Sequence, residues 1–211
     1  MRALLFDVFG TCVDWRTGIN RAAARFGLPA IADDWRAQYQ PQLETVRSGK
    51  RPWVRLDILH RIGLDVVLRD HGLALDEAER DALTKAWHRL DPWPDVVEGL
   101  TRLKANSIIA PCSNGHIAQS VNLARHAGLP WDAILGAELA QAYKPDPRVY
   151  LRSVEALGLQ PHEACMVAAH RDDLIAAAQV GLKTAFVPRP REPEGPPFDA
   201  DIVAWDFLEL V

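Results

Sequence analysis

The sequence has few cysteines, no long uninterrupted apolar stretch and no excess of basic residues. Cys12, Cys112 and Cys165 lie far apart and form no CxxC pair, which argues against a disulfide framework or a zinc cluster. The first apolar run stops at Asp7, too early for a secretory signal, and no later run approaches the roughly 18 residues of a membrane span. Lys and Arg number 24 against 28 Asp and Glu. With no positive field to recruit nucleic acid or anionic lipid, we expect a cytoplasmic protein that binds neither nucleic acid nor membranes.

The 211 residues suffice for one large domain or a core with an insertion, and 48% of them are apolar. Short apolar runs alternate with helical patterns near the N-terminus and through the second half, which is typical of βαβ units. Their continuous hydrophobicity favours an α/β fold with a Rossmann-like parallel sheet covered on both faces. The predicted strands are Ala3–Phe9, Ser107–Cys112, Ala133–Leu135, Cys165–Ala168 and Thr184–Val187.

Residues 15–94 carry Trp, Arg, Leu and Ala on helical periods and contain no convincing strand. We predict that they form a helical cap inserted after the first strand, and that residues 1–14 and 95–211 form the core. Trp53, Trp87 and Trp93 are expected to pack inside the cap rather than to line a pocket. The proline-rich segment from Val187 to Phe198 is expected to be a stiff surface connection.

Two predicted strands end at polar side chains. Asp7 closes the first, and Gly10 allows the following turn to expose its backbone amides. Because ligands of open α/β sheets bind beyond the carboxyl ends of the strands, Asp7 is a candidate for catalysis, the alternative being an Asp that caps the turn. Ser113 and Asn114 fall at the second turn, with Asn114 as predicted N-cap of a helix that stops at Gly128.

Four segments in this order resemble the signatures of the haloacid dehalogenase superfamily, and together they cover essentially the whole chain. They are Asp7-Val8-Phe9-Gly10-Thr11, Ser113-Asn114-Gly115, Lys144-Pro145-Asp146-Pro147 and an acidic segment from Ala169 to Asp173. The resemblance implies a Rossmann-like core of that type with Asp7 as its nucleophile.

The sequence departs from the magnesium-dependent phosphatases of that superfamily at two positions. Phe9 stands where they carry a second Asp that protonates the leaving alcohol, and Phe can neither give nor take a proton. Ala169 stands where their GDxxxD segment has its first acid. Asp7 and Asp173 alone make a poor magnesium site, so we predict no metal and no cofactor.

The pattern is similar to the L-2-haloacid dehalogenase (type II) branch, which has an aromatic residue at the position of Phe9. The pair Trp35-Arg36 and the segment from Lys144 to Tyr150 fit the same branch. The resemblance implies hydrolytic dehalogenation of short 2-haloalkanoic acids with inversion, through an ester on Asp7. The partners are then only a small 2-haloacid and water, with a homodimer possible.

The resemblance also implies roles for individual residues. Arg36 and Asn114 would solvate the departing halide, and Ser113 with the turn amides would hold the substrate carboxylate. Asp173 would be the base for the hydrolytic water. The remaining roles are Thr11 orienting Asp7, Lys144 ordering both carboxylates, and Phe9, Tyr150 and His170 lining the substrate site.

The sequence alone leaves other roles open for several of these residues. Arg36 could be a surface residue of a cap helix, Lys144 a solvated loop lysine, and Tyr150 a locally packed ring. His170 could order the hydrolytic water, narrow the pocket or bond a loop carbonyl. The whole protein could instead be a phosphatase-like hydrolase with an unusual metal site, or a binding protein of the same fold that has lost turnover.

Overall fold

One parallel sheet runs through the computed structural model, which describes residues 1–193 and 195–210. Within those residues the strand order is β3-β2-β1-β4-β5-β6, and every pair is parallel. The predicted α/β fold class is confirmed. The strands are β1 (Ala3–Phe6), β2 (Ile108–Ser113), β3 (Leu135–Gly136), β4 (Ala164–Ala168), β5 (Lys183–Phe186) and β6 (Ile202–Val203), of which β6 was not predicted.

Helices cover both faces of this sheet, as the continuous apolar strands predict. In β1, Leu4 and Phe6 point into one core cluster, whereas Ala3 and Leu5 point into the other. The first cluster includes side chains of α6 (Val96–Lys104) and α7 (Ile117–Ala127), and the second includes side chains of α9 (Pro147–Ala156) and α10 (Arg171–Gln179). The short α8 (Ala137–Ala140) and the 3₁₀ turn η2 (Pro161–Glu163) complete this layer.

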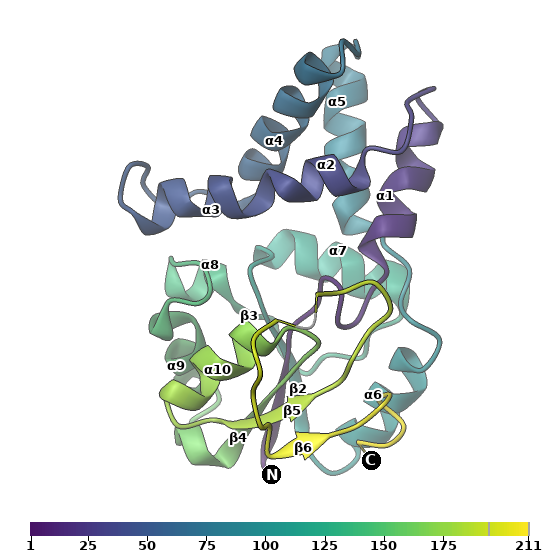
Figure 1. The fold of residues 1–211 in the computed structure, drawn as a ribbon. Helices are drawn as coiled ribbons and strands as arrows, with labels where there is room; N and C mark the ends of the chain where they lie inside the picture. Colours follow the sequence, from purple (N-terminus) through teal and green to yellow (C-terminus); the bar gives the residue numbers. More distant parts are fainter. Residues whose placement is uncertain (194, 211) are drawn as a thin grey trace.

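A second layer of helices stands over one edge of the sheet layer (Figure 1). The prediction that residues 15–94 form a separate cap, with these boundaries, stays a prediction. Among residues 1–193 and 195–210, no helix combines the length and apolar character needed to cross a membrane. The helices of the upper layer are α1 (Trp15–Ala24), α2 (Ala32–Ala37), α3 (Tyr39–Arg47), α4 (Leu56–Asp70), α5 (Glu77–Thr84) and the 3₁₀ turn η1 (Lys85–His88).

Aromatic side chains fill the interior of the upper layer. Trp35 and Trp87 are almost fully buried, and their rings meet edge to face with centroids 5.5 Å apart. The indole of Trp15 stacks on Trp87 at 6.1 Å. Such rings supply most of the apolar area that a small helical layer can bury. Trp87 is therefore a core residue, as predicted, whereas Trp15 reaches the cavity described below. Cys12, Cys112 and Cys165 are buried and free.

The start of α7 differs from the prediction. Its N-cap is His116, because the side-chain oxygen of Asn114 accepts a hydrogen bond from Lys144 N instead of capping the helix. Ile117 and Val121 lie one turn apart on α7, and they are 44% and 38% exposed. The predicted stop at Gly128 is confirmed, with a left-handed φ of 70°.

Candidate active site

Parallel pairing brings the ends of three strands to one edge of the sheet. β1 lies between β2 and β4, so the residues that follow these strands, including Asp7, Asn114 and His170, meet there. A cavity of about 800 Å³ opens between this edge and the upper helices. It is lined by most of the predicted site residues, namely Asp7, Phe9, Arg36, Asn114, Lys144, Tyr150, His170 and Asp173. Thr11 and Ser113, the other two predicted site residues, are not among the described residues that line this cavity.

Asp7 is held by donors on both carboxylate oxygens. Lys144 Nζ lies 3.0 Å from Oδ1, and Thr11 Oγ1 donates to Oδ2 at 2.8 Å. Thr11 itself is fixed because its hydroxyl oxygen accepts from Ala169 N. Burial alone would raise the pKa of Asp7, but Lys144 and His170 outweigh it and hold the pKa below its usual range. The side chain is therefore an ionised and oriented carboxylate.

Lys144 joins Asp7 to a second buried acid, Asp173. Its ammonium contacts Oδ2 of Asp173, whose other oxygen accepts from the Tyr150 hydroxyl at 2.5 Å. Burial, together with the charge of Asp7, raises the pKa of Asp173 although Lys144 opposes the change. Burial lowers the pKa of Lys144, but both acids act more strongly and leave it above its usual value. The ammonium group of Lys144 therefore lies between the two acids and contacts one oxygen of each.

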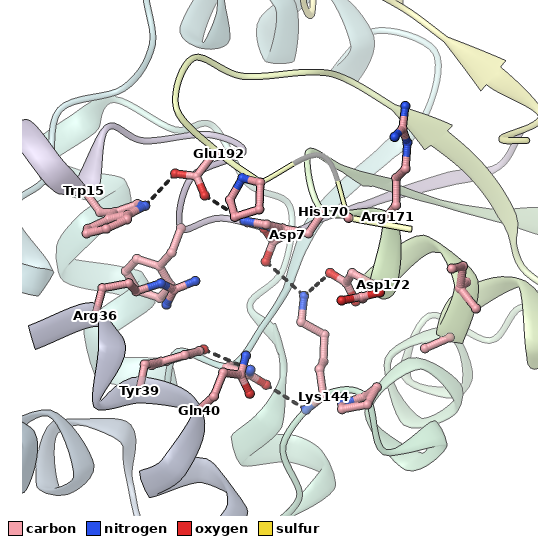
Figure 2. A pocket seen from close by; sticks show the side chains of 18 of the residues that line it. Asp7, Trp15, Arg36, Tyr39, Gln40, Lys144, His170, Arg171, Asp172 and Glu192 are labelled. Atoms are coloured by element: carbon pink, nitrogen blue, oxygen red, sulfur yellow. Dashed lines mark hydrogen bonds and ion pairs between the residues drawn. The ribbon is translucent and has the colours of Figure 1, made fainter. Parts of the chain in front are cut away.

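Asn114 connects the cavity to the upper layer. Its Nδ2 donates to the hydroxyl of Tyr39 at 2.9 Å, and its Oδ1 accepts from Lys144 N at 2.8 Å (Figure 2). Ser113 lies behind it, and its hydroxyl oxygen accepts from Gly115 N. That bond uses a lone pair of Ser113 and leaves its O–H free to donate.

Arg36 lies over aromatic faces at the edge of the cavity. Its guanidinium carbon is 4.1 Å from the centre of the Tyr39 ring and 5.4 Å from that of Trp15 (Figure 2). Stacking engages the faces of the guanidinium and leaves its in-plane N–H groups available. Within the described part of the chain, Nη1 is buried without a hydrogen-bond partner. Together with the apolar ring of Phe9, Arg36 can receive an anion in this cavity.

His170 bridges two carboxylates. Its Nδ1 lies 3.0 Å from Oδ2 of Asp7, and its Nε2 lies 2.9 Å from Oε2 of Glu192. Burial lowers the pKa of His170, but its hydrogen bonds to Asp7 and Glu192 outweigh this and raise the pKa to about 9. The free site therefore holds a protonated imidazole between two acids.

Glu192 is the site residue that the sequence analysis missed. It belongs to the proline-rich segment expected to be only a surface connection, yet its side chain is 5% exposed and accepts from Trp15 Nε1 at 2.6 Å (Figure 2). A Cβ on Gly10 would come within 2.7 Å of the Glu192 carboxyl carbon. The Glu192 carboxylate can therefore lie this close to the backbone only because residue 10 is a glycine. The sequence contains no pattern that predicts this contact.

The raised pKa of His170 gives the fold a pH-dependent stability. Because folding raises the pKa from about 6.5 to about 9, the stabilisation is fully present below about pH 6.5 and is lost as the pH rises through about 9. A shift of this size corresponds to about 3 kcal/mol. Urea unfolding from about pH 6 to pH 10 should show the wild type losing this increment relative to His170→Gln. A constant difference between the two proteins would contradict the raised pKa.

Comparison with known proteins gives one consistent set of relatives. Residues 1–181 match the family model described as haloacid dehalogenase-like hydrolase. The chain is 32% identical to (S)-2-haloacid dehalogenase 4A of Burkholderia cepacia over 198 residues, which are 92% of this chain and 85% of that protein. The crystal structure of the defluorinating L-2-haloacid dehalogenase Rha0230 superposes with a TM-score of 0.95 at 48% identity, covering 100% of this chain and 93% of the other. A dehalogenase solved with an intermediate complex is 28% identical with a TM-score of 0.87, covering 100% and 95%.

Proposed function

The chain belongs to the haloacid dehalogenase-like hydrolases, and we propose that it hydrolyses short 2-haloalkanoic acids to 2-hydroxyalkanoic acids with inversion. The observation that carries this proposal is the ionised Asp7 fixed by Lys144 in a cavity with Phe9 at the position of the phosphatase acid. Displacement of a halide needs a carboxylate nucleophile and donors for the departing anion, but no acid. The relatives named (S)-2-haloacid dehalogenase support the same reaction.

In the first half-reaction, one carboxylate oxygen of Asp7 attacks C2 of the substrate from the side opposite the halogen. A C–O bond forms, the carbon–halogen bond breaks with its electron pair leaving on the halide, and C2 is inverted. Arg36 and Asn114 receive the halide through N–H groups already present in the pocket. The hydroxyl of Ser113 and the amides of the turn after Asp7 hold the substrate carboxylate.

The second half-reaction hydrolyses the ester at the Asp7 carboxyl carbon. Esterification removes the Asp7 charge, which is one of the two charges that raise the pKa of His170, so this pKa falls and the ring can give its proton to the solvent and act as a base. We propose His170, rather than the predicted Asp173, as this base. Without the Asp7 charge, Asp173 is left in an ion pair with Lys144 and a bond from Tyr150, which makes it less basic.

The protons balance over this cycle. His170 takes one proton from water as the hydroxide adds to the ester carbon, while Lys144 faces the oxyanion that develops on the Asp7 carboxyl. Collapse expels the alkoxide, which takes that proton from His170 and leaves as the hydroxyacid. The new carboxylic acid then returns its proton to His170. One proton, released after esterification, accompanies each halide.

The small substrate and water are the partners that this mechanism needs. A homodimer and a cytoplasmic location stay predictions, and sedimentation of the pure protein tests the first of them. The 800 Å³ cavity exceeds the size of a two-carbon acid. We therefore propose that water fills the remaining space and supplies the second half-reaction.

Halide release tests the proposed function directly. Chloroacetate, fluoroacetate and both enantiomers of 2-chloropropionate are incubated with enzyme, with and without EDTA. We expect halide from chloroacetate and from the (S) enantiomer, with a rate that the chelator does not change, because side chains of this chain and water carry every proposed step. Magnesium-dependent phosphate release from an aryl phosphate, without halide release, would favour the phosphatase-like alternative.

A further inference from the structure

A second group of ionisable side chains lies where the two layers meet. Asp57 comes from α4, His88 from η1 and His116 from the turn before α7. His88 Nε2 lies 2.9 Å from Asp57 Oδ1, and His116 Nε2 lies 3.7 Å from Asp57 Oδ2. One nitrogen or oxygen from each residue falls within 4.8 Å of the other two. Both imidazoles are 4% exposed, and none of the three residues is among those described as lining the cavity around Asp7.

The chemistry of this cluster suits a transition metal. Neutral imidazole nitrogens and a carboxylate are common ligands of Zn²⁺, and a site with three protein ligands keeps a fourth position for water. Ligands about 2.0–2.1 Å from a tetrahedral ion are separated from each other by about 3.3 Å. From a single Asp57 oxygen, Oδ2, Nε2 of His88 lies 3.1 Å away and Nε2 of His116 lies 3.7 Å away, and these distances are close to that spacing. Burial holds the pKa of His116 below its usual value, which favours the neutral ring.

The neighbours of the cluster can orient a ligand. Nδ2 of Asn122 lies 3.0 Å from Nδ1 of His88, the nitrogen that faces away from Asp57, and as placed it donates to that nitrogen. With its amide turned so that the oxygen accepts from Nδ1–H, Asn122 would fix the tautomer that exposes a lone pair on Nε2. His116 Nδ1 is buried and has no hydrogen-bond partner within the described residues.

The ammonium group of Lys85 provides a positive charge next to Asp57. Its ammonium contacts Asp57 Oδ2, and the lysine side chain is 58% exposed. Because Lys85 reaches Asp57, which is 15% exposed, from the solvent side, its ammonium can move into solvent when a cation replaces it.

We propose that Asp57, His88 and His116 bind a divalent transition metal ion of the Zn²⁺ class, separate from the reaction site. Two ligands belong to the upper helices and one to the sheet layer, so the ion fastens these layers together.

The test uses the full-length protein without an affinity tag and Co²⁺ or Zn²⁺ alone. Titration with Co²⁺ should give a visible absorption spectrum of a four-coordinate ion that saturates at one ion per chain. Zn²⁺ should displace it and raise the thermal midpoint, since it binds the folded state. His116→Ala should weaken binding on the order of 100-fold or more. The control His126→Ala removes a His–Asp ion pair near the other end of α7, and it should leave the affinity for Co²⁺ unchanged.

Lys85→Met provides the complementary variant, because it removes the competing cation from an exposed position. We expect it to bind Co²⁺ on the order of tenfold more tightly than the wild type. Absence of a saturable spectrum in both proteins, or equal affinity in the wild type and His116→Ala, would overturn the site. Halide release is measured separately, so failure of this site leaves the proposed reaction unaffected.

Discussion

Replacing Asp7 with Asn is expected to lower the kcat for halide release by a factor on the order of 10⁴ or more. The amide has nearly the same size and can still accept from Lys144, so the fold should remain. It carries no negative charge and cannot form the ester. Halide release from (S)-2-chloropropionate, followed with a chloride electrode, measures the loss.

A labelling experiment on the wild type separates this role from a merely electrostatic one. In a single turnover in heavy-oxygen water, the label should appear in the Asp7 carboxylate, because water attacks the Asp7 carboxyl carbon rather than C2. Asp91→Asn, which neutralises an exposed acid paired with Arg21, serves as the control and should keep wild-type rates. Label that appears first in the hydroxyacid, or an Asp7→Asn variant with more than about 1% of the activity, would rule out the covalent scheme.

The residues that could be predicted from the sequence are those attached to strand ends. Asp7 follows β1, and Asn114 follows β2, so the parallel order alone brings them to one edge of the sheet. Lys144 lies just before α9, whose start can be recognised in the sequence, because Asp146 is its N-cap and Pro147 lies in its first turn. For these residues the local sequence pattern determines the secondary structure, and the order of the parallel strands then determines that their side chains lie close together.

Features that depend on long-range contacts could not be predicted. Glu192 lies in a segment without periodicity, and its place is set by Trp15 and His170, which are 177 and 22 residues away. The position of Asn114 is typical of a helix N-cap, but its side-chain oxygen accepts a hydrogen bond from Lys144 N, 30 residues away. A helix before Gly128 was predicted correctly, yet nothing in the sequence indicates that the apolar side chain of Ile117 is 44% exposed. Periodicity shows that a helix is present but does not show what covers it.

Replacing His170 with Gln is expected to leave ester formation largely intact and to slow ester hydrolysis by a factor on the order of 10² to 10⁴. Gln can hydrogen-bond to Asp7 and Glu192 but cannot accept a proton at neutral pH. Rapid mixing with (S)-2-chloropropionate should therefore release one halide per site in a burst, followed by slow turnover. Mass spectrometry of the quenched protein should find the substrate chain attached to Asp7.

The same experiment distinguishes the two candidate bases. If Asp173 were the base, Asp173→Asn would accumulate the ester and His170→Gln would not. Glu192→Gln removes a charge and one of the two acceptor oxygens, so the side chain can still accept from Trp15 Nε1 but no longer accepts from a protonated His170; it should slow hydrolysis by roughly tenfold.

The pH profile of ester hydrolysis follows from the same charges. Once Asp7 is esterified, the pKa of His170 falls below about 9, since one of the two carboxylates that raise it has been neutralised. The rate of ester hydrolysis in a single turnover should rise with pH through this lower pKa, as the neutral base forms. Glu192→Gln removes the second charge and should move the rise to still lower pH, whereas His170→Gln should abolish it. A wild-type rate that does not change from about pH 6 to about pH 9 would show that no group of this kind supplies the base.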